Sequence, residues 1–222
     1  MDKSVIIALV GAESTGKTAL ASAVSERMAA ATGLRCSWVP EVLRSWCEDH
    51  GRTPQQHEQA AIATAQAAAI DSATQDHDLV LCDTTPLMIA VYSEMVFGDT
   101  SLYPMACAWQ QRCDLTLLTA LDLPWIADGL QRDGPHVREP VDALLRRQLI
   151  AQRLRWSLVG GQGEARIEAA IDAIAPLLRR RGTPRDGLFT RLAERDAAQP
   201  EWRWACDQCD SPECEHATKR MT

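Results

Sequence analysis

The chain has 222 residues, a formal net charge of -7 and an apolar fraction of 46%, which suits one well-buried domain with a short appendage. The acidic balance argues against a surface for nucleic acid or anionic membrane, because such surfaces usually cluster Lys and Arg. No segment approaches the roughly 20 apolar residues that span a bilayer, and the run Val5–Val10 is too short for a signal-peptide core. We therefore expect a cytoplasmic protein with small-molecule partners.

Short apolar strands alternate with helical segments along most of the chain. The strands are predicted at Val5–Val10, Cys36–Val39, Leu79–Cys82, Leu115–Leu118 and Trp156–Val159. The first helix, Thr18–Thr32, stops before Gly33, and the longest, at about Pro54–Gln75, is filled with the good helix formers Ala and Gln. The last runs from Glu164 to about Leu178, where Pro176 bends or ends it. The alternation predicts an α/β three-layer sandwich, a five-stranded, mainly parallel sheet with helices on both faces.

The loop between the first strand and the first helix carries the clearest motif. It matches G-x-x-x-x-G-K-[ST] through Gly11, Ala12, Glu13, Ser14, Thr15, Gly16, Lys17 and Thr18. Its two glycines let the backbone curl so that successive N–H groups face phosphate oxygens. Lys17 would bridge the β- and γ-phosphates and Thr18 would offer its hydroxyl to Mg²⁺. A chance match should arise in only about one chain in a hundred of this length. The motif predicts a P-loop NTPase fold that binds ATP or another nucleoside triphosphate.

Two classes of P-loop protein are disfavoured by the later loops. The stretch Thr119–Asp122 lacks the Asn and the Lys with which GTPases read guanine. Leu158–Gln162 resembles the signature loop of transporter ATPases, but no apolar strand ending in Asp-Glu follows it. The same loop joins the fifth strand to the last helix, where small P-loop kinases wrap the adenine. Gly161 is therefore a predicted ATP-binding residue.

Carboxylates follow or close two of the predicted strands, and ligands gather at the carboxyl ends of parallel strands. Glu41, after the second strand, is placed to accept the proton of an attacking hydroxyl. Alternatively, it caps the next helix or pairs with Arg44. Asp83, closing the third strand, would hold the water shell of Mg²⁺. Alternatively, some of the polar residues around Thr84–Pro86 are there because they cap the N-terminus of the next helix.

The segment Leu121–Gly134 combines an aromatic residue, acids and an arginine between turn formers, and we interpret it as a lid. Trp125 could stack on a flat ring, and Asp128 could hold ribose hydroxyls or a cationic ring. Arg132 and Arg138 would close on the phosphates, because the planar guanidinium matches phosphate oxygens bidentately. One such arginine can supply roughly 10³ to 10⁵ in rate. The alternative is a solvated loop with incidental charges.

The run Pro124–Leu130, together with the P-loop, resembles the ribosylnicotinamide kinase domain of NadR-type proteins over roughly Lys3–Leu178. The stretch Pro40–Trp46 also resembles the base-bearing segment of deoxynucleoside kinases. The resemblance implies transfer of the γ-phosphate of ATP, with Mg²⁺, to the 5′-hydroxyl of nicotinamide riboside or a related nucleoside, in NAD biosynthesis.

This sequence departs from the NadR pattern in ways that limit the comparison. It carries neither the adenylyltransferase domain nor the helix-turn-helix of longer members, so only the kinase step is expected to carry over. Gln131 stands where the family usually places Arg directly after Leu, which leaves the catalytic arginine open. The rival interpretation is a regulatory NadR-like ATPase that senses a nucleotide and signals through its tail. The oligomeric state is open, and a homo-oligomer is one alternative.

The composition changes after residues 1–181, the predicted kinase domain, and residues 182–222 are predicted to form a linker, a short helix and a Cys- and His-rich tail. The tail carries four good Zn²⁺ donors in the order C-x₂-C-x₄-C-x-H: Cys206, Cys209, Cys214 and His216. A structural zinc site competes there with an exposed acidic tail that has free thiols. The five other cysteines are scattered through predicted core elements, and we expect them to be reduced.

Overall fold

The computed structural model describes residues 3–127 and 134–179. Its five strands are β1 (Val5–Val10), β2 (Cys36–Val39), β3 (Leu79–Asp83), β4 (Leu115–Thr119) and β5 (Trp156–Val159). They form one sheet in the order β2-β3-β1-β4-β5, and each pairing of neighbours is parallel. The predicted strands are confirmed to within one residue at either end.

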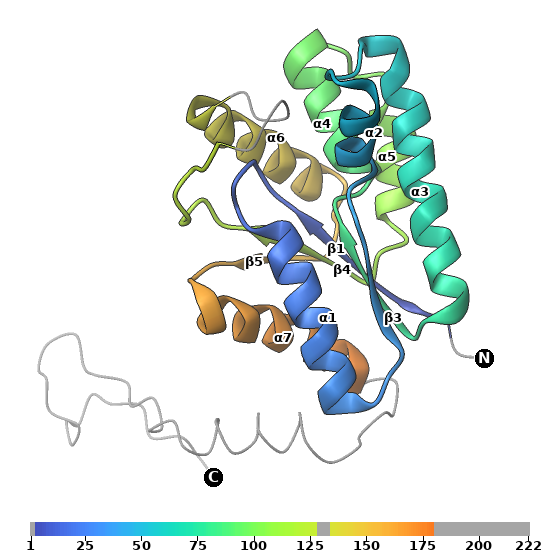
Figure 1. The fold of residues 1–222 in the computed structure, drawn as a ribbon, viewed down its shortest axis with the longest axis vertical. Helices are drawn as coiled ribbons and strands as arrows, with labels where there is room; N and C mark the ends of the chain where they lie inside the picture. The colour runs from blue at the N-terminus through green and yellow to red at the C-terminus, as the bar shows by residue number, and fades with distance from the viewer. Residues whose placement is uncertain (1–2, 128–133, 180–222) are drawn as a thin grey trace, which may run out of the picture. The chain divides into compact units, whose positions relative to one another are not determined.

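Helices cover both faces of this sheet (Figure 1). They are α1 (Lys17–Thr32), α2 (Val42–His50), α3 (Gln59–Asp76), α4 (Pro86–Phe97), α5 (Tyr103–Gln110), α6 (Arg138–Ala151) and α7 (Gly163–Arg179), with the short 3₁₀ turns η1 (Gln56–Glu58) and η3 (Pro135–Val137). Helix α1 packs against α7 and against strands β2 and β3, while α4 packs against α3, α5 and α6. The predicted three-layer α/β sandwich is confirmed.

The central strands are apolar along their whole length because both of their faces are covered. Each residue of β1 is at most 2% exposed, and β3 is buried from end to end. Strands of this kind have continuous β-branched and leucine-rich sequences rather than an alternating pattern. The core therefore holds β1 rigidly, and the loop that follows β1 inherits that rigidity.

The helix ends agree closely with the sequence signals. Gly33 ends α1 in the left-handed conformation, with φ of 69°, and α4 begins at Pro86. The long helix starts later than predicted because a 3₁₀ turn occupies residues 56–58 before α3. Pro176 lies inside α7, which continues to Arg179. The predicted domain boundary after residue 181 lies outside the described residues.

A transmembrane segment is not found: within residues 3–127 and 134–179, no helix is both long and apolar enough to cross a bilayer.

Candidate active site

The site lies at the carboxyl edge of the sheet, between β1 and β3. The helices that follow these two strands, α1 and α4, lie on opposite faces, which makes this the switch point of the topology. Leu9 of β1 pairs with Asp83 of β3, so Asp83 stands beside the start of the P-loop. Val39 of β2 pairs with Cys82, which brings the segment that carries Glu41 to the same edge.

The P-loop has the backbone that its glycines predict. Gly11 and Gly16 have φ of 154° and 75°, and Ser14, with φ of 55°, is one of the few non-glycine residues at positive φ. A Cβ on Gly11 would lie 2.0 Å from Oγ1 of Thr119, so no other residue fits at that position without movement. Lys17 donates from Nζ to the carbonyl oxygens of Gly11 at 2.9 Å and of Ala12 at 3.0 Å. Its ammonium therefore reaches back across the mouth of the loop.

Thr18 and Asp83 form a hydroxyl–carboxylate pair next to the P-loop. Oγ1 of Thr18 donates to Oδ2 of Asp83, while Oδ1 of Asp83 is buried without a hydrogen-bond partner among the described residues. Asp83 is only 1% exposed, and burial raises the pKa of its carboxyl group, against the effect of Thr18, Lys17 and Arg44. Hard oxygen donors with one unsatisfied carboxylate oxygen fit Mg²⁺. Among the described residues, no group of three or more His, Cys, Asp or Glu side chains could hold a metal by itself.

Thr84 and Thr85 follow Asp83 at the start of α4. Thr84 has φ of 70°, which is unusual for a β-branched residue, and its N–H donates to Leu9 at 3.1 Å. Thr85 is the N-cap residue of α4 but makes no side-chain capping bond to that fully described helix. Instead, its hydroxyl donates to Gln110 at 2.7 Å. The helix start thus accounts for the position of Thr85, while Asp83 remains directed at the P-loop.

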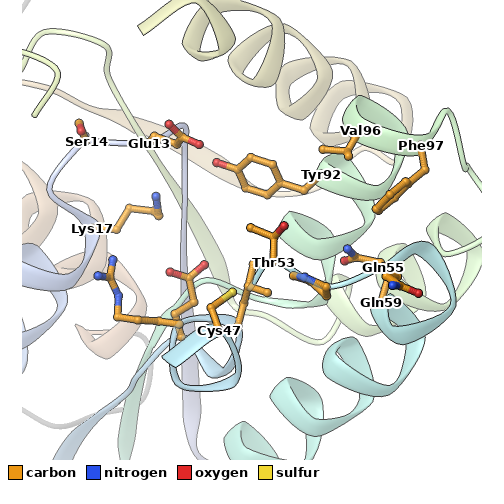
Figure 2. Close-up of a pocket in the computed structure, with 14 residues that line it drawn as sticks. Glu13, Ser14, Lys17, Cys47, Thr53, Gln55, Gln59, Tyr92, Val96 and Phe97 are labelled. Carbon is orange, nitrogen blue, oxygen red and sulfur yellow. The ribbon is translucent and has the colours of Figure 1, made fainter. Parts of the chain in front are cut away.

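A cavity of about 360 Å³ opens beside the P-loop (Figure 2). Its charged lining residues are Glu13, Lys17, Glu41 and Arg44, and Figure 2 shows Glu13 and Lys17 on the side opposite Val96 and Phe97. Its neutral and apolar lining residues include Thr53, Gln55, Gln59, Tyr92, Val96 and Phe97. Its volume falls within the usual range of small-molecule sites. Glu13 belongs to the P-loop motif, yet its side chain lines this cavity.

Glu41 occupies the N-cap position of α2, but its side chain makes no capping bond to that helix, all of whose residues are described. It lines the cavity together with Lys17 and Arg44. The thiol of Cys47 lies near both charges: burial raises its pKa most, Glu41 raises it further and Arg44 lowers it. The side chain of Glu41 therefore faces the cavity rather than the helix end.

The predicted lid is in contact with the P-loop through the part that the structure describes. The hydroxyl of Ser14 donates to the carbonyl of Ile126 at 2.9 Å, and the N–H of Ile126 donates to Oγ of Ser14 at 3.1 Å. Trp125 has a buried indole N–H without a hydrogen-bond partner among residues 3–127 and 134–179. Asp128 and Arg132 lie outside the described residues.

Arg138 begins α6 and is 9% exposed. Its Nε and Nη2 are buried without a hydrogen-bond partner in the described part of the chain. Arg138 is not among the described residues that line the cavity. A buried guanidinium with two unsatisfied nitrogens is costly, so this side chain is suited to an anionic ligand.

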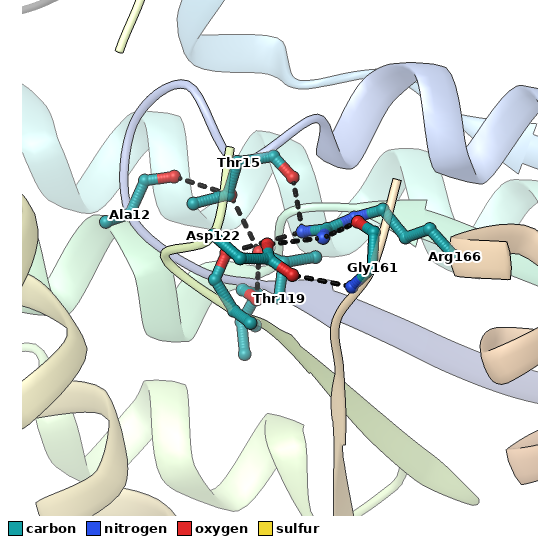
Figure 3. A network of polar contacts seen from close by, with 8 residues as sticks. Ala12, Thr15, Thr119, Asp122, Gly161 and Arg166 are labelled. Atoms are coloured by element: carbon teal, nitrogen blue, oxygen red, sulfur yellow. Dashed lines mark hydrogen bonds and ion pairs between the residues drawn. The ribbon is translucent and has the colours of Figure 1, made fainter. Parts of the chain in front are cut away.

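The structure adds a polar network that the sequence motifs did not indicate (Figure 3). Arg166 of α7 donates to Asp122 at 2.7 Å and to the carbonyls of Gly161 at 2.9 Å and Thr15 at 2.8 Å. The N–H of Gly161 donates to the other oxygen of Asp122 at 2.5 Å. The network joins the P-loop, the lid and the loop predicted to hold adenine.

A sequence signal for Arg166 does exist. It lies four and eight residues before Ala170 and Ile174, which are fully buried, so an arginine occupies the apolar face of an amphipathic helix. For Asp122 the sequence indicates only membership of the predicted lid and of a stretch that lacks a guanine-reading motif, not a bond to Arg166. Thr119, whose hydroxyl donates to Oγ1 of Thr15 at 2.7 Å, gave no signal beyond the end of a strand.

The five cysteines within the described residues are free: Cys36, Cys47, Cys82, Cys107 and Cys113. Burial raises the pKa of the Cys36 thiol to about 11, which makes it a poor nucleophile. Cys206, Cys209, Cys214 and His216 lie outside the described residues, and a zinc site there stays a prediction.

A family model described as an AAA domain (AAA_28) matches residues 6–166, from β1 to Arg166. The chain belongs to this AAA domain family. The match covers the P-loop, Asp83 and the lid of the AAA domain, but not the tail. The curated proteins include no match to it.

Solved structures with the same fold as this AAA domain include two of NadR, one in complex with NAD and AMP-PNP and one in complex with NR. Their TM-scores are 0.62 and 0.64, with 21% sequence identity over 78% of this chain. The chain spans about half the length of these NadR structures, 49% and 50%. A deoxyadenosine kinase from M. mycoides with bound dATP matches with a TM-score of 0.51 and 12% identity, over 77% of this chain and 100% of that one. The AAA domain therefore has a P-loop kinase-like fold.

Proposed function

We propose that this AAA domain is an ATP-dependent kinase that transfers the γ-phosphate to the 5′-hydroxyl of nicotinamide riboside or a related nucleoside. The observation that carries the proposal is the cavity that runs from Lys17 and Glu41 to an end lined by Tyr92 and Phe97. Residues of the P-loop, a carboxylate and a partly apolar lining thus meet in one cavity. The fold-level likeness to NadR and to a deoxyadenosine kinase supports a nucleoside acceptor by analogy.

The nucleotide would lie along the P-loop with its polyphosphate at the N-terminus of α1. Backbone N–H groups of the loop and the positive end of the helix dipole favour negative charge there. Lys17 would exchange its carbonyl partners for β- and γ-phosphate oxygens, and Arg138 would add a second cation. The adenine would follow the loop at Gly161, which is fixed by Asp122.

Mg²⁺ would be held between the Thr18 hydroxyl and Asp83, whose Oδ1 has no partner among the described residues. When bound, the ion offsets the negative charge of the triphosphate. Thr18 and Asp83 would be the protein groups that hold the ion, because the pairing of Leu9 with Asp83 brings the Asp83 carboxylate to the P-loop.

Glu41 would act as the general base. As the 5′-oxygen forms its bond to the γ-phosphorus, the hydroxyl proton moves to the Glu41 carboxylate and the bond to the β-phosphate oxygen breaks, releasing ADP. A general base placed in this way contributes about 10² to 10⁴ in rate. The position of Glu41 in the lining of the same cavity as Lys17 supports this role.

The far end of the cavity suits a planar base that carries a hydrogen-bonding group. Tyr92 and Phe97 offer aromatic surface. Gln59, which is 5% exposed, has a buried Oε1 without a partner among the described residues. A carboxamide or an exocyclic amine would satisfy that amide oxygen, whereas a carboxylate would not. Trp125 and Asp128 would close over the ribose and the base from the lid.

The test is a panel of nucleosides incubated with ATP and Mg²⁺, with products separated and identified by mass spectrometry. The panel contains nicotinamide riboside, nicotinic acid riboside and the common ribo- and deoxyribonucleosides, and Lys17→Ala is the inactive control. We expect a 5′-monophosphate of at least one nucleoside, with nicotinamide riboside preferred over its carboxylate analogue. If ATP is hydrolysed but no nucleoside gains phosphate, the kinase proposal fails and the regulatory ATPase is favoured.

A further inference from the structure

Arg166 lies outside the P-loop motif, yet it is bound to the P-loop. Its side chain is 5% exposed, and its one carboxylate partner within the described residues is Asp122. Its remaining bonds go to main-chain carbonyls, of Gly161 at 2.9 Å, of Thr15 at 2.8 Å and of Ala120 at 3.4 Å. Because most of its bonds go to loop carbonyls, this nearly buried cation holds the loop backbone in position rather than pairing with charges at the surface.

The bond to Thr15 sets the direction of one particular peptide. The peptide that joins Thr15 to Gly16 is trans, because the described residues contain no cis bond. In a trans peptide the C=O and the N–H point to opposite sides. Nη2 of Arg166 holds the carbonyl of Thr15 on the side of β4 and α7 (Figure 3). The N–H of Gly16 then points away from Arg166, on the side of the P-loop where the polyphosphate is expected.

The side chain of Thr15 is fixed as firmly as its carbonyl. Its Oγ1 donates to the carbonyl of Ala12 at 2.8 Å and accepts from Thr119 at 2.7 Å. Thr15 is completely buried. Both ends of this residue are therefore anchored to the sheet side of the loop, and the peptide that follows it has little freedom to turn.

The same guanidinium reaches the loop after β5. Nη1 of Arg166 donates to both Gly161 and Asp122, and the N–H of Gly161 donates back to Asp122. One rigid fork thus connects the turn expected beside the adenine to the turn expected around the phosphates. A lysine has a single ammonium and cannot keep these separate directions at once.

We propose that Arg166 is a positioning residue that aims the Gly16 N–H at the nucleotide's polyphosphate and couples the phosphate cradle to the Gly161 loop. It touches neither the nucleotide nor the acceptor. The proposal rests on the nucleotide half of the proposed function and is independent of the acceptor. The proposal predicts an effect on ligands with two or more linked phosphates, because the Gly16 N–H would donate to the phosphate chain.

The experiment measures dissociation constants without any acceptor, for ATP, ADP, AMP and inorganic tripolyphosphate, by titration calorimetry with Mg²⁺. The variants are Arg166→Lys and Arg166→Gln. The matched control is Arg27→Lys, because within the described residues the Arg27 side chain joins α1 to the Glu164 and Glu168 side chains of α7 and does not bond to the P-loop carbonyls. Melting temperatures are measured on the same samples.

Loss of a charge-assisted hydrogen bond predicts that the Arg166 variants weaken ATP, ADP and tripolyphosphate by about tenfold to a hundredfold. AMP should be weakened less, and Arg27→Lys should bind all four ligands like the parent. Equal loss for AMP and ATP, or unchanged binding of tripolyphosphate, would overturn the proposal. Failure of both Arg166 variants to fold would show a purely structural role and would also overturn it. If the parent protein binds no polyphosphate at all, the proposed function fails instead.

Discussion

The two halves of the candidate site are built in different ways. Around the phosphates, Thr15, Thr119 and Arg166 are buried and joined to one another by backbone and side-chain hydrogen bonds. Around the acceptor, the walls come from side chains of α2, α3 and α4, and Phe97 and Val96 are 37% and 57% exposed. The first half is fixed by the sheet, and the second depends on surface helices. In the proposed kinase, the phosphate geometry would thus be set by the fold, and the choice of acceptor by a few side chains.

Backbone strain is concentrated on the rigid side. Ser14 in the P-loop and Thr84 after Asp83 adopt positive φ without being glycine, at 55° and 70°. Each such residue costs on the order of 1 to 3 kcal/mol and persists only where its surroundings hold it. The N–H of Thr84 is held by Leu9 of β1. The sheet therefore holds the turn at Thr84 in place, while Ser14 is held by its two bonds to Ile126.

The largest effect is expected from Glu41→Gln, which separates the two halves directly. The amide keeps the shape of the side chain but cannot accept a proton, so kcat should fall by about 10² to 10⁴. The dissociation constant of ATP should stay unchanged, because the phosphate half is intact. Steady-state kinetics and calorimetry check both values, with the exposed Glu48→Gln on the same helix as the control. Full activity in Glu41→Gln would remove Glu41 from the mechanism.

Gly11→Ala tests how tightly the phosphate half is packed. The new Cβ would lie 2.0 Å from Oγ1 of Thr119, and overpacking of this kind costs about 1 to 3 kcal/mol. Gly51→Ala is the control, because Gly51 also has a positive φ, of 63°, but open space around its Cβ position; that strain costs roughly 1 kcal/mol.

Thermal unfolding should show a larger loss for Gly11→Ala than for Gly51→Ala. Adding Thr119→Ala to Gly11→Ala should recover part of the difference, because it removes the clashing oxygen. Equal losses at the two glycines would mean that the P-loop can yield, and the contrast between the halves would weaken.

Most of the fold and the core of the phosphate site could be predicted because their signals are local. Buried strands, helix-stop glycines and the P-loop each fit within a few consecutive residues. The network around Arg166 could not be predicted in the same way, since Arg166 and Thr15 are 151 positions apart. Their contact depends on how α7 packs against α1, which no spacing reports. Glu13 shows a related limit: the motif predicts that it binds ATP, which stays a prediction, but no spacing indicates that it also lines the cavity beside the P-loop.

Asp83→Asn is expected to raise the melting temperature and to abolish the activity. Burial raises the pKa of Asp83, so the folded protein disfavours the carboxylate. The stability contributed by such a group is fully present below its unfolded-state pKa and is lost as the pH rises through the folded-state pKa. The variant should therefore melt at a higher temperature than the parent at neutral pH without nucleotide, and the gain should shrink on acidification. Phosphoryl transfer should be lost.

Melting curves across the pH range, with the exposed Asp49→Asn as the control, check the stability part of this prediction. A lower melting temperature for Asp83→Asn at neutral pH would mean that the bond from Thr18 outweighs the cost of burial.

The smallest effect is expected at the edge of the acceptor half, from Glu58→Gln. Glu58 accepts two hydrogen bonds from Arg52 and one from the N–H of Gln55, each at 2.7 Å. The Arg52 hydrogen bond is the main reason that its pKa falls from 4.5 to about 2. A lowered pKa gives stability that is present above the unfolded-state value and is lost as the pH falls through the folded-state value. The variant should melt slightly below the parent at neutral pH, and the difference should vanish between pH 4.5 and about 2.

Because Gln55 lines the cavity, Glu58→Gln should also raise the KM for the acceptor by roughly two- to fivefold. The dissociation constant of ATP should not change, since in the described part of the chain Glu58 bonds to Arg52 and Gln55 and not to the P-loop. The matched control is Arg35→Gln, which removes another exposed ion pair, with Asp78. Arg35 directly precedes β2, at the end of that strand remote from Glu41, so this variant should leave both constants unchanged. A change in ATP affinity with an unchanged acceptor KM would mean that the η1 turn acts on the phosphate cradle, and the two halves would then have to be treated as one coupled unit.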